Sequence, residues 1–185
     1  MINDTLKKII ALKDLSVEEA ASSMQEIMDG AATPAQIAGF ITALRMKGET
    51  VDEIIGCARV MREKALRVFL NHDAIDIVGT GGDGANTFNV STCSAFVVAA
   101  AGVPVAKHGN RAVSSRCGSA DVLESLGTRI TLMPEQALDC LERTGVCFMF
   151  AQSYHASMKY AAGPRRELGL RTVFNLLGPL SNPAH

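Results

Sequence analysis

The first seventy residues carry apolar side chains at helical spacing, with a start signal ahead of each later run. Leu6, Ile9 and Ile10 place apolar groups along one side of a first helix. Three capping boxes then mark helix starts, in which a hydroxyl and a Glu or Gln satisfy each other's backbone groups: Ser16 with Glu19, Thr33 with Gln36, and Thr50 with Glu53. We therefore expect helices over 17–29, 34–47 and 51–66, in a small helical domain over residues 1–70.

After residue 70 the pattern changes to short apolar runs separated by helical segments. The runs at 74–78, 103–107 and 146–150 predict strands, and the last is apolar throughout, as in a buried parallel strand. A short strand is also expected at 129–132. The segments between and after the strands predict helices over 91–101, 119–126, 134–143, 154–162 and 165–168. This alternation predicts an α/β fold: a small N-terminal helical domain plus a mainly parallel-sheet α/β domain that occupies residues 71–185.

The last fifteen residues, 171–185, carry two turn signals, Gly178-Pro179 and Asn182-Pro183. Three clear strands would leave a small sheet with an unpaired edge. We therefore expect the chain to be the first part of a larger α/β domain that has been truncated, with residues 171–185 packing back on the helical domain.

Composition and charge narrow the class of protein. The chain is 48% hydrophobic and 20% charged, and its net charge of −1 predicts no broad basic face for binding nucleic acid. The five cysteines are odd in number and none forms a C-x-x-C pair, which predicts reduced, buried thiols in a cytoplasmic protein. The longest apolar run, 95–105, is too short to cross a membrane and contains Gly102 and Pro104.

Two glycine-rich, hydroxyl-rich segments follow the first two expected strands. They read GTGGDGANTFNVST from Gly79 and KHGNRAVSSRCGSAD from Lys107. Glycine lets a backbone approach a ligand closely, and successive N–H groups in such a loop form a concave anion site. The helix expected at 91–101 adds free N–H groups at its start. Because ligands of parallel sheets bind beyond the carboxyl ends of the strands, we predict one site for a phosphate-rich ligand.

The glycines also fit a dinucleotide fingerprint, Gly79-x-Gly81-x-x-Gly84. That fingerprint requires its helix to begin within the motif and an acid at the end of the next strand. Here Asn86, Thr87 and Asn89 delay the helix, and the next strand ends at Lys107. A nicotinamide or flavin enzyme is therefore disfavoured, and the sequence also lacks a G-x-x-x-x-G-K-[ST] motif.

Together these motifs resemble the anthranilate phosphoribosyltransferase family. The segments that carry the resemblance are Gly79–Asp83, Asn89–Thr92, Lys107–Arg111, Ser114–Ser115, Gly118–Asp121, Arg171–Asn175 and Gly178–Leu180. The resemblance implies a glycosyltransferase of tryptophan biosynthesis that joins anthranilate to phosphoribosyl pyrophosphate (PRPP) with Mg²⁺ and releases pyrophosphate. It also implies a homodimer formed through the N-terminal helices.

The resemblance further implies the site residues. Those for PRPP are Gly79, Gly82, Asp83, Thr87, Asn89, Val90, Ser91, Thr92, Lys107, His108, Gly109, Asn110, Arg111, Ala112, Val113, Ser114, Ser115 and Ser119. Ser91 is similar to a magnesium ligand, since Mg²⁺ prefers oxygen donors. Gly79, Asn110 and Arg165 match positions that hold anthranilate, and the guanidinium of Arg165 suits its carboxylate.

No catalytic base is assigned. His108 is a candidate, and the alternative is a structural role in shaping its loop. His155 is similar to a histidine near the anthranilate channel, with Tyr154 as a further wall; the alternative is a surface histidine. The sequence departs from the family at Ala156, where proline is frequent, and at Cys117, where serine is frequent and where we expect a buried thiol.

The family's acidic Asp-Glu pair for magnesium would lie beyond residue 185, so we expect the 185-residue chain alone to be inactive or nearly so. Three alternatives stay open. They are a pyrimidine nucleoside phosphorylase-like enzyme, a non-catalytic relative that binds nucleic acid, and a fragment that only dimerises.

Overall fold

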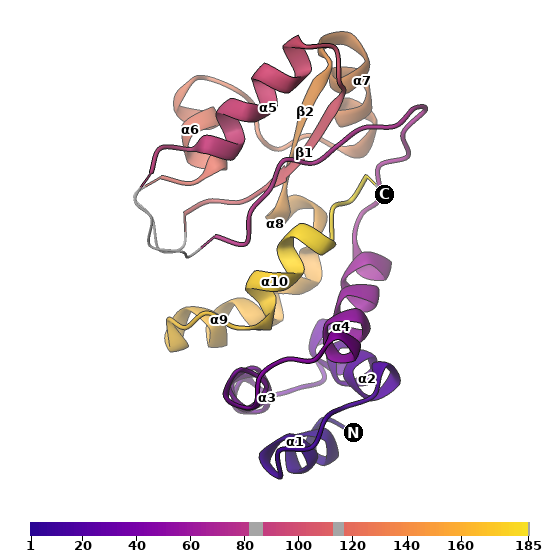
Figure 1. Cartoon of the computed structure of the whole chain (residues 1–185), viewed down its shortest axis with the longest axis vertical. Helices are drawn as coiled ribbons and strands as arrows, with labels where there is room; N and C mark the ends of the chain where they lie inside the picture. The colour runs from indigo at the N-terminus through magenta and orange to yellow at the C-terminus, as the bar shows by residue number, and fades with distance from the viewer. Residues whose placement is uncertain (82–86, 113–116, 185) are drawn as a thin grey trace. The chain divides into compact units, whose positions relative to one another are not determined.

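The computed structural model describes residues 1–81, 87–112 and 117–184 (Figure 1). The chain divides into two compact units. A helical unit comprises Met1–Lys64 and Ala156–Ser181, and an α/β unit comprises Ala65–His155 and Asn182–His185. The C-terminal segment that belongs to the helical unit comprises Ala156–Ser181. From the sequence, residues 171–185 were expected instead.

The helical unit begins with four helices, α1 (Ile2–Ile10), α2 (Val17–Met28), α3 (Pro34–Lys47) and α4 (Val51–Lys64). All three predicted capping boxes are formed. The later segment adds the 3₁₀ turn η1 (Ala156–Met158), α9 (Lys159–Leu168) and α10 (Val173–Leu180). Helix α2 packs on α4, α1 on α3, and α9 on α3.

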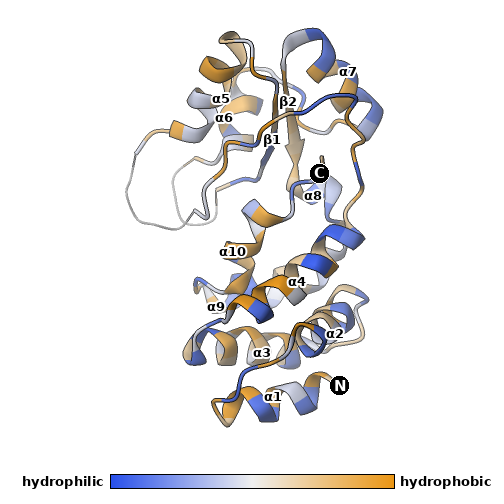
Figure 2. Ribbon diagram, turned by 45° about the vertical axis from the view of Figure 1, so that its right-hand side comes forward, coloured by the Kyte–Doolittle hydropathy of each residue, from blue (hydrophilic) through white to orange (hydrophobic). Residues whose placement is uncertain are grey.

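A single apolar core holds this unit together. Phe40, Ile41 and Leu44 of α3 are fully buried, together with Met24 of α2 and Leu177 of α10. Figure 2 shows both hydrophobic and hydrophilic colours on α1 and α4, as expected for helices with one side in a core.

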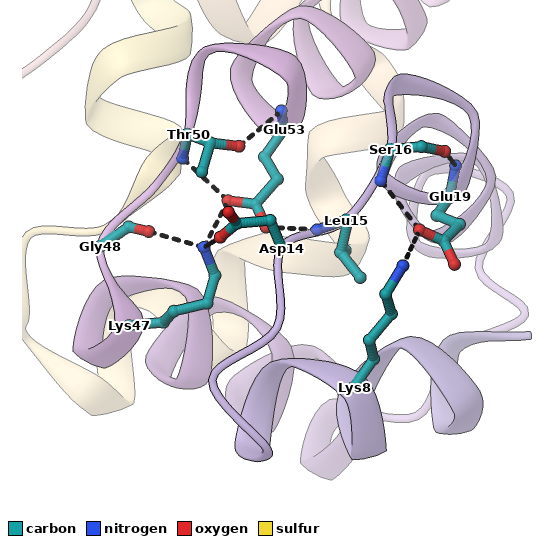
Figure 3. A network of polar contacts seen from close by, with 9 residues as sticks. All are labelled: Lys8, Asp14, Leu15, Ser16, Glu19, Lys47, Gly48, Thr50 and Glu53. Atoms are coloured by element: carbon teal, nitrogen blue, oxygen red, sulfur yellow. Dashed lines mark hydrogen bonds and ion pairs between the residues drawn. The ribbon is translucent and has the colours of Figure 1, made fainter.

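A buried polar network fixes the turn between α3 and α4 (Figure 3). The carboxylate of Glu53 accepts the backbone N–H groups of Leu15 and Thr50 at 2.9 and 2.8 Å. Lys47 donates to the same carboxylate at 3.0 Å and to Asp14 at 2.8 Å. Burial opposes the charge of Lys47, but the two carboxylates outweigh it and the pKa of Lys47 is raised.

The α/β unit contains α5 (Val90–Ala100), β1 (Val105–Gly109), α6 (Ser119–Ser125), α7 (Pro134–Thr144), β2 (Val146–Phe150) and α8 (Ala151–Tyr154). Strands β1 and β2 are parallel, with Val105 opposite Val146 and Gly109 opposite Phe150. Figure 1 shows α5 and α6 on one side of the strands and α7 on the other. Phe148 and Phe150 contact α6, whereas Cys147 and Met149 contact α7. The predicted fold class is thus confirmed.

Several predicted elements differ from the structure. The helices expected at 154–162 and 165–168 are replaced by α8, η1 and the continuous helix α9. Segment 74–78 forms a single parallel bridge at Ile75 instead of a strand. Segment 129–132 is a loop whose Ile130 reaches the core without strand pairing. The expected turn at Gly178-Pro179 lies inside α10, because burial of Val173, Phe174 and Leu177 outweighs the local turn signal.

The thiols are only partly as predicted. Cys57 and Cys147 are buried, whereas Cys93 and Cys117 are exposed. The expectation of a buried thiol at Cys117 is wrong, because this residue precedes α6 in a surface loop. Among the helices of the described residues, none has the length and apolar character needed to cross a membrane.

Candidate active site

The chain segment that leads to the first glycine-rich loop pairs with β1 at one position and then leaves the sheet. Ile75 donates its N–H to the Pro104 carbonyl oxygen at 2.9 Å, and its own carbonyl accepts the Ala106 N–H at 2.9 Å. Beyond this bridge, side chains bind the backbone groups. Lys107 Nζ donates to the Ile77 carbonyl oxygen at 2.6 Å, and Asp76 Oδ1 accepts the His108 N–H at 3.2 Å.

These bonds place the starts of the two glycine-rich segments side by side. Gly79 follows Ile77 by two residues, and Asn110 follows His108 by two. Because Lys107 and His108 bind Ile77 and Asp76, both segments leave from the carboxyl end of β1. The juxtaposition predicted from the sequence is therefore formed at the described ends of the segments.

Lys107 and Asp76 are both partly withdrawn from water. Burial lowers the pKa of Lys107, and the nearby negative charge of Asp76 opposes that effect. Burial likewise raises the pKa of Asp76, opposed chiefly by the hydrogen bond from Asn182 Nδ2 to Asp76 Oδ2 at 2.8 Å. An added anion near Lys107 would favour its charged form, which suits a phosphate site.

Helix α5 offers an open N-terminus. Asn89 precedes it without making a side-chain cap, and the Val90 N–H donates to the Phe88 carbonyl oxygen at 2.7 Å. Among the described residues, the N–H groups that follow therefore lack the usual side-chain acceptor. Ser91 is half-buried and Thr92 is buried, whereas Thr87 and Val90 are exposed. This arrangement can accept an anion through backbone groups.

In the glycine-rich segment that follows β1, hydrogen bonds join residues 110, 112 and 118 to side chains of α6. Asp121 Oδ2 accepts the N–H groups of Ala112 and Gly118 at 2.9 and 2.8 Å, and these bonds lower its pKa. Ser119 Oγ donates to the Asn110 carbonyl oxygen at 3.2 Å. A Cβ at Gly118 would collide with the backbone of Asn110, Arg111 and Ala112, so only glycine fits there.

Arg111 is engaged by acids rather than left open toward the loop. Its guanidinium binds Asp121 at 3.0 Å and Glu124 at 2.7 Å, and these partners raise its pKa. It also lies 5.5 Å from the centre of the Phe150 ring. A phosphate would have to share this guanidinium with two carboxylates.

Two histidines lie together at the end of the sheet. The rings of His108 and His155 are 5.1 Å apart, and both residues are buried. His155 is thus not a surface histidine. Tyr154 is buried as well, and its hydroxyl donates to the Leu132 carbonyl oxygen at 2.9 Å. Burial raises the pKa of Tyr154 to about 12.

A cavity of about 860 Å³ adjoins the predicted PRPP residues. Thr92 and Lys107 contribute to its wall, together with Phe96 of α5, Phe148 of β2 and Cys140 of α7. The described residues contain no group of three or more His, Cys, Asp or Glu side chains able to hold a metal ion.

Arg165 belongs to the helical unit and is described there. It lies on α9 with its guanidinium 4.9 Å from the centre of the Phe174 ring. Burial lowers its pKa. A partly buried guanidinium stacked on an aromatic ring is suited to bind a carboxylate.

Several predicted PRPP residues lie outside the described residues: Gly82, Asp83, Val113, Ser114 and Ser115. Conversely, Asp76, Asp121 and Asn182 were not named from the sequence as residues of the site. Asp76 had a usable signal, because it is a lone acid within the apolar run of 74–78. Asn182 carried no signal beyond its turn-forming Asn-Pro pair.

Two family models together match most of the chain. A model described as "Glycosyl transferase family, helical bundle domain" matches residues 3–65, and "Glycosyl transferase family, a/b domain" matches residues 71–185. The chain belongs to this glycosyl transferase family.

Within that family, the resemblance to anthranilate phosphoribosyltransferases is confirmed. The chain is 62% identical over 185 residues to the anthranilate phosphoribosyltransferase of Pelotomaculum thermopropionicum, covering 100% of this chain and 54% of the relative. It is likewise 62% identical over 185 residues to that of Cellvibrio japonicus, again covering 100% and 54%. The chain thus spans about half the length of these curated relatives.

Solved structures give the same result. The anthranilate phosphoribosyltransferase of Thermus thermophilus is 49% identical with a TM-score of 0.91, over 98% of this chain and 55% of that one. The Saccharomyces cerevisiae enzyme in complex with PRPP and Mg is 30% identical with a TM-score of 0.89, over 99% and 55%.

Proposed function

We propose that the protein containing this chain transfers the phosphoribosyl group of PRPP to the amine of anthranilate in tryptophan biosynthesis, releasing pyrophosphate. The observation that carries the proposal is the junction at β1, where Lys107 and His108 bind Ile77 and Asp76. That junction brings two glycine-rich segments to one edge, as a ligand with two phosphorylated ends requires. The yeast relative solved with PRPP and Mg supports the same ligand.

Each candidate residue then has a chemical role. Lys107 and the open start of α5 neutralise phosphate charge, and many such donors must act together because a helix end contributes only about 0.3–1 kcal/mol when exposed. Asn110 and Arg165 orient anthranilate, with Arg165 on its carboxylate. The amine then attacks the sugar from the face opposite the departing pyrophosphate. We expect inversion at that carbon, through a transition state resembling an oxocarbenium ion.

Magnesium fits the donor chemistry of this site. Ser91 supplies a hydroxyl oxygen beside the α5 start, and Mg²⁺ is commonly bound by few protein oxygens together with phosphates. When bound, the ion would neutralise charge that builds on the leaving group. The phosphates of PRPP would supply most of the remaining oxygens.

We further propose that the protein is cytoplasmic and forms a homodimer through its N-terminal helices. The helical unit exposes large apolar side chains at Ile10, Leu12, Met46 and Val51, each at least 72% accessible. Such exposure favours a protein partner. Light scattering tests the dimer, and a monomer at micromolar concentration would refute it.

The activity is tested by pyrophosphate release with the protein at its full encoded length. Release should require PRPP, Mg²⁺ and anthranilate together. Calorimetry should detect PRPP binding in the presence of Mg²⁺. Release that does not depend on anthranilate would refute the assignment, and filter binding of nucleic acid at moderate salt would favour the non-catalytic relative.

A further inference from the structure

The side chain of Asn182 occupies a position where a parallel β-ladder would otherwise continue. Segment 74–78 and β1 are in register at Ile75 and Val105. The next pair of bonds in such a ladder would join the Ile77 N–H to the Ala106 carbonyl, and the His108 N–H to the Ile77 carbonyl. None of these backbone groups is used in that way in this part of the described chain.

Three side chains take these groups instead. Asn182 Nδ2 donates to the Ala106 carbonyl oxygen at 2.9 Å, and Asp76 Oδ1 accepts the His108 N–H at 3.2 Å. Lys107 Nζ donates to the Ile77 carbonyl oxygen. Asn182 Nδ2 also donates to Asp76 Oδ2 at 2.8 Å, so its carboxamide joins the departing segment to β1.

Asn182 is itself held in a fixed orientation. Its Oδ1 accepts the Ala184 N–H at 2.8 Å, which fixes which end of the carboxamide donates. The adjoining Pro183 carbonyl oxygen accepts the Val68 N–H at 3.0 Å. On the other side of Asn182, Ser181 Oγ donates to the Leu177 carbonyl oxygen at 2.8 Å, so the carboxamide enters the sheet from a segment anchored on both sides.

We propose that Asn182 is a positioning residue for the PRPP site. Its carboxamide prevents segment 76–78 from pairing further with β1, so the chain leaves the sheet before Gly79. The Ile77 carbonyl then remains available to Lys107, which orients the lysine at the junction of the two glycine-rich segments. Without the carboxamide, Ile77 can close the next pair of ladder bonds and displace Lys107.

This inference rests on the proposed function, because it assigns Asn182 to the donor half of that reaction. It predicts a selective effect. Loss of Asn182 should weaken PRPP binding, while binding of anthranilate at saturating PRPP should change little. A residue that only stabilises the fold would not separate the two substrates in this way.

The test uses N182L in the protein at its full encoded length. We expect the KM for PRPP to rise by at least about tenfold, a loss of about 1.4 kcal/mol, with the KM for anthranilate within about twofold of wild type. The matched control is N71L, which removes an exposed asparagine of the same unit that donates to Glu142. An unchanged KM for PRPP in N182L, with an active wild type, would overturn the inference alone.

A second variant keeps the test decisive if N182L does not fold. N182D retains the size and the acceptor for Ala184 but cannot donate to Ala106 or Asp76. Adding D76N restores a donor to the 76–182 pair, so N182D/D76N should recover part of the PRPP affinity lost in N182D. No recovery would count against the inference, and a wild type without PRPP-dependent turnover would refute it together with the proposed function.

Discussion

The carboxylate of Glu53 accepts the backbone N–H of Leu15 at 2.9 Å, across 38 positions of the chain. Glu53 is completely buried, and the same carboxylate also binds Thr50 and Lys47. The carboxylate therefore ties the segment before α2 to the start of α4. The capping box between Glu53 and Thr50 was predictable from the sequence. The hydrogen bond between Glu53 and Leu15 was not.

We predict that E53A destabilises the chain by about 2–4 kcal/mol, because it leaves the backbone N–H groups of Leu15 and Thr50 without their acceptor, while Lys47 keeps its bond to Asp14. Urea unfolding followed by circular dichroism measures the change. E18A is the matched control, since Glu18 is an exposed residue on the first turn of α2, and we expect a change within about 0.5 kcal/mol. A loss below about 1 kcal/mol in E53A would show that the network contributes little.

Substitution of Gly79 should lower the affinity for PRPP without changing the stability of the fold. A Cβ at this position meets no atom of the described residues within 4 Å, so G79A should fold normally. If PRPP approaches the backbone there, the added methyl group should obstruct it, and we expect affinity to fall by at least about tenfold. Calorimetry with PRPP and Mg²⁺ measures this change on the protein at its full encoded length.

G39A is the control for that substitution. Gly39 lies inside α3 of the helical unit, and its added Cβ would make only ordinary contacts with Leu6. It should gain about 0.5–1 kcal/mol of stability from helix propensity without changing PRPP affinity. Equal affinities in G79A and wild type would show that the ligand does not reach this glycine.

Much of the helical unit could be predicted because its signals are local. The capping pairs Ser16–Glu19, Thr33–Gln36 and Thr50–Glu53 each lie within four residues, and each marks a helix start correctly. By contrast, α10 was missed because Gly178-Pro179 is a local turn signal. Burial of Val173, Phe174 and Leu177 decides that segment, and burial depends on contacts with distant helices.

The site was predictable where it depends on the type of residue and its place after a strand. Lys107 and the open start of α5 fall in this class. The partners of Arg111 were not, because Asp121 and Glu124 reach it only once α6 has folded back. The hydrogen bond between Asp76 and Asn182 was not predictable either, because these residues are 106 positions apart in the sequence. A strand pattern also cannot reveal that side chains will end the ladder after Ile75.

Removing a carboxylate from the Arg111 guanidinium should change the affinity for PRPP. E124Q removes one carboxylate from the guanidinium and leaves Asp121 to hold the loop. If Arg111 helps bind a phosphate, freeing it should strengthen PRPP binding at low ionic strength, with less effect at high salt. R111Q, as the opposite change, should weaken it. Isothermal titrations at two salt concentrations measure both, and equal affinities would remove Arg111 from the ligand set.

The buried thiol of Cys57 should make the chain less stable in alkaline solution. Burial raises its pKa to about 12, whereas an unfolded thiol ionises near pH 8.5. The folded state therefore holds a proton that the unfolded state has lost, so stability falls as the pH rises from about 8.5 toward 12. Between about pH 8 and pH 10, this single group should cost roughly 1–2 kcal/mol.

The measurement is the difference in unfolding free energy between those two pH values, which cancels the packing cost of a substitution. In C57A this difference should be smaller than in wild type by roughly 1–2 kcal/mol. C93A, which removes an exposed thiol from α5, is the control and should behave as wild type. The buried ammonium of Lys47 and the thiol of Cys147 also respond to alkali, but both are present in each variant and cancel. An alkaline loss in C57A equal to that of wild type would show that Cys57 ionises without unfolding.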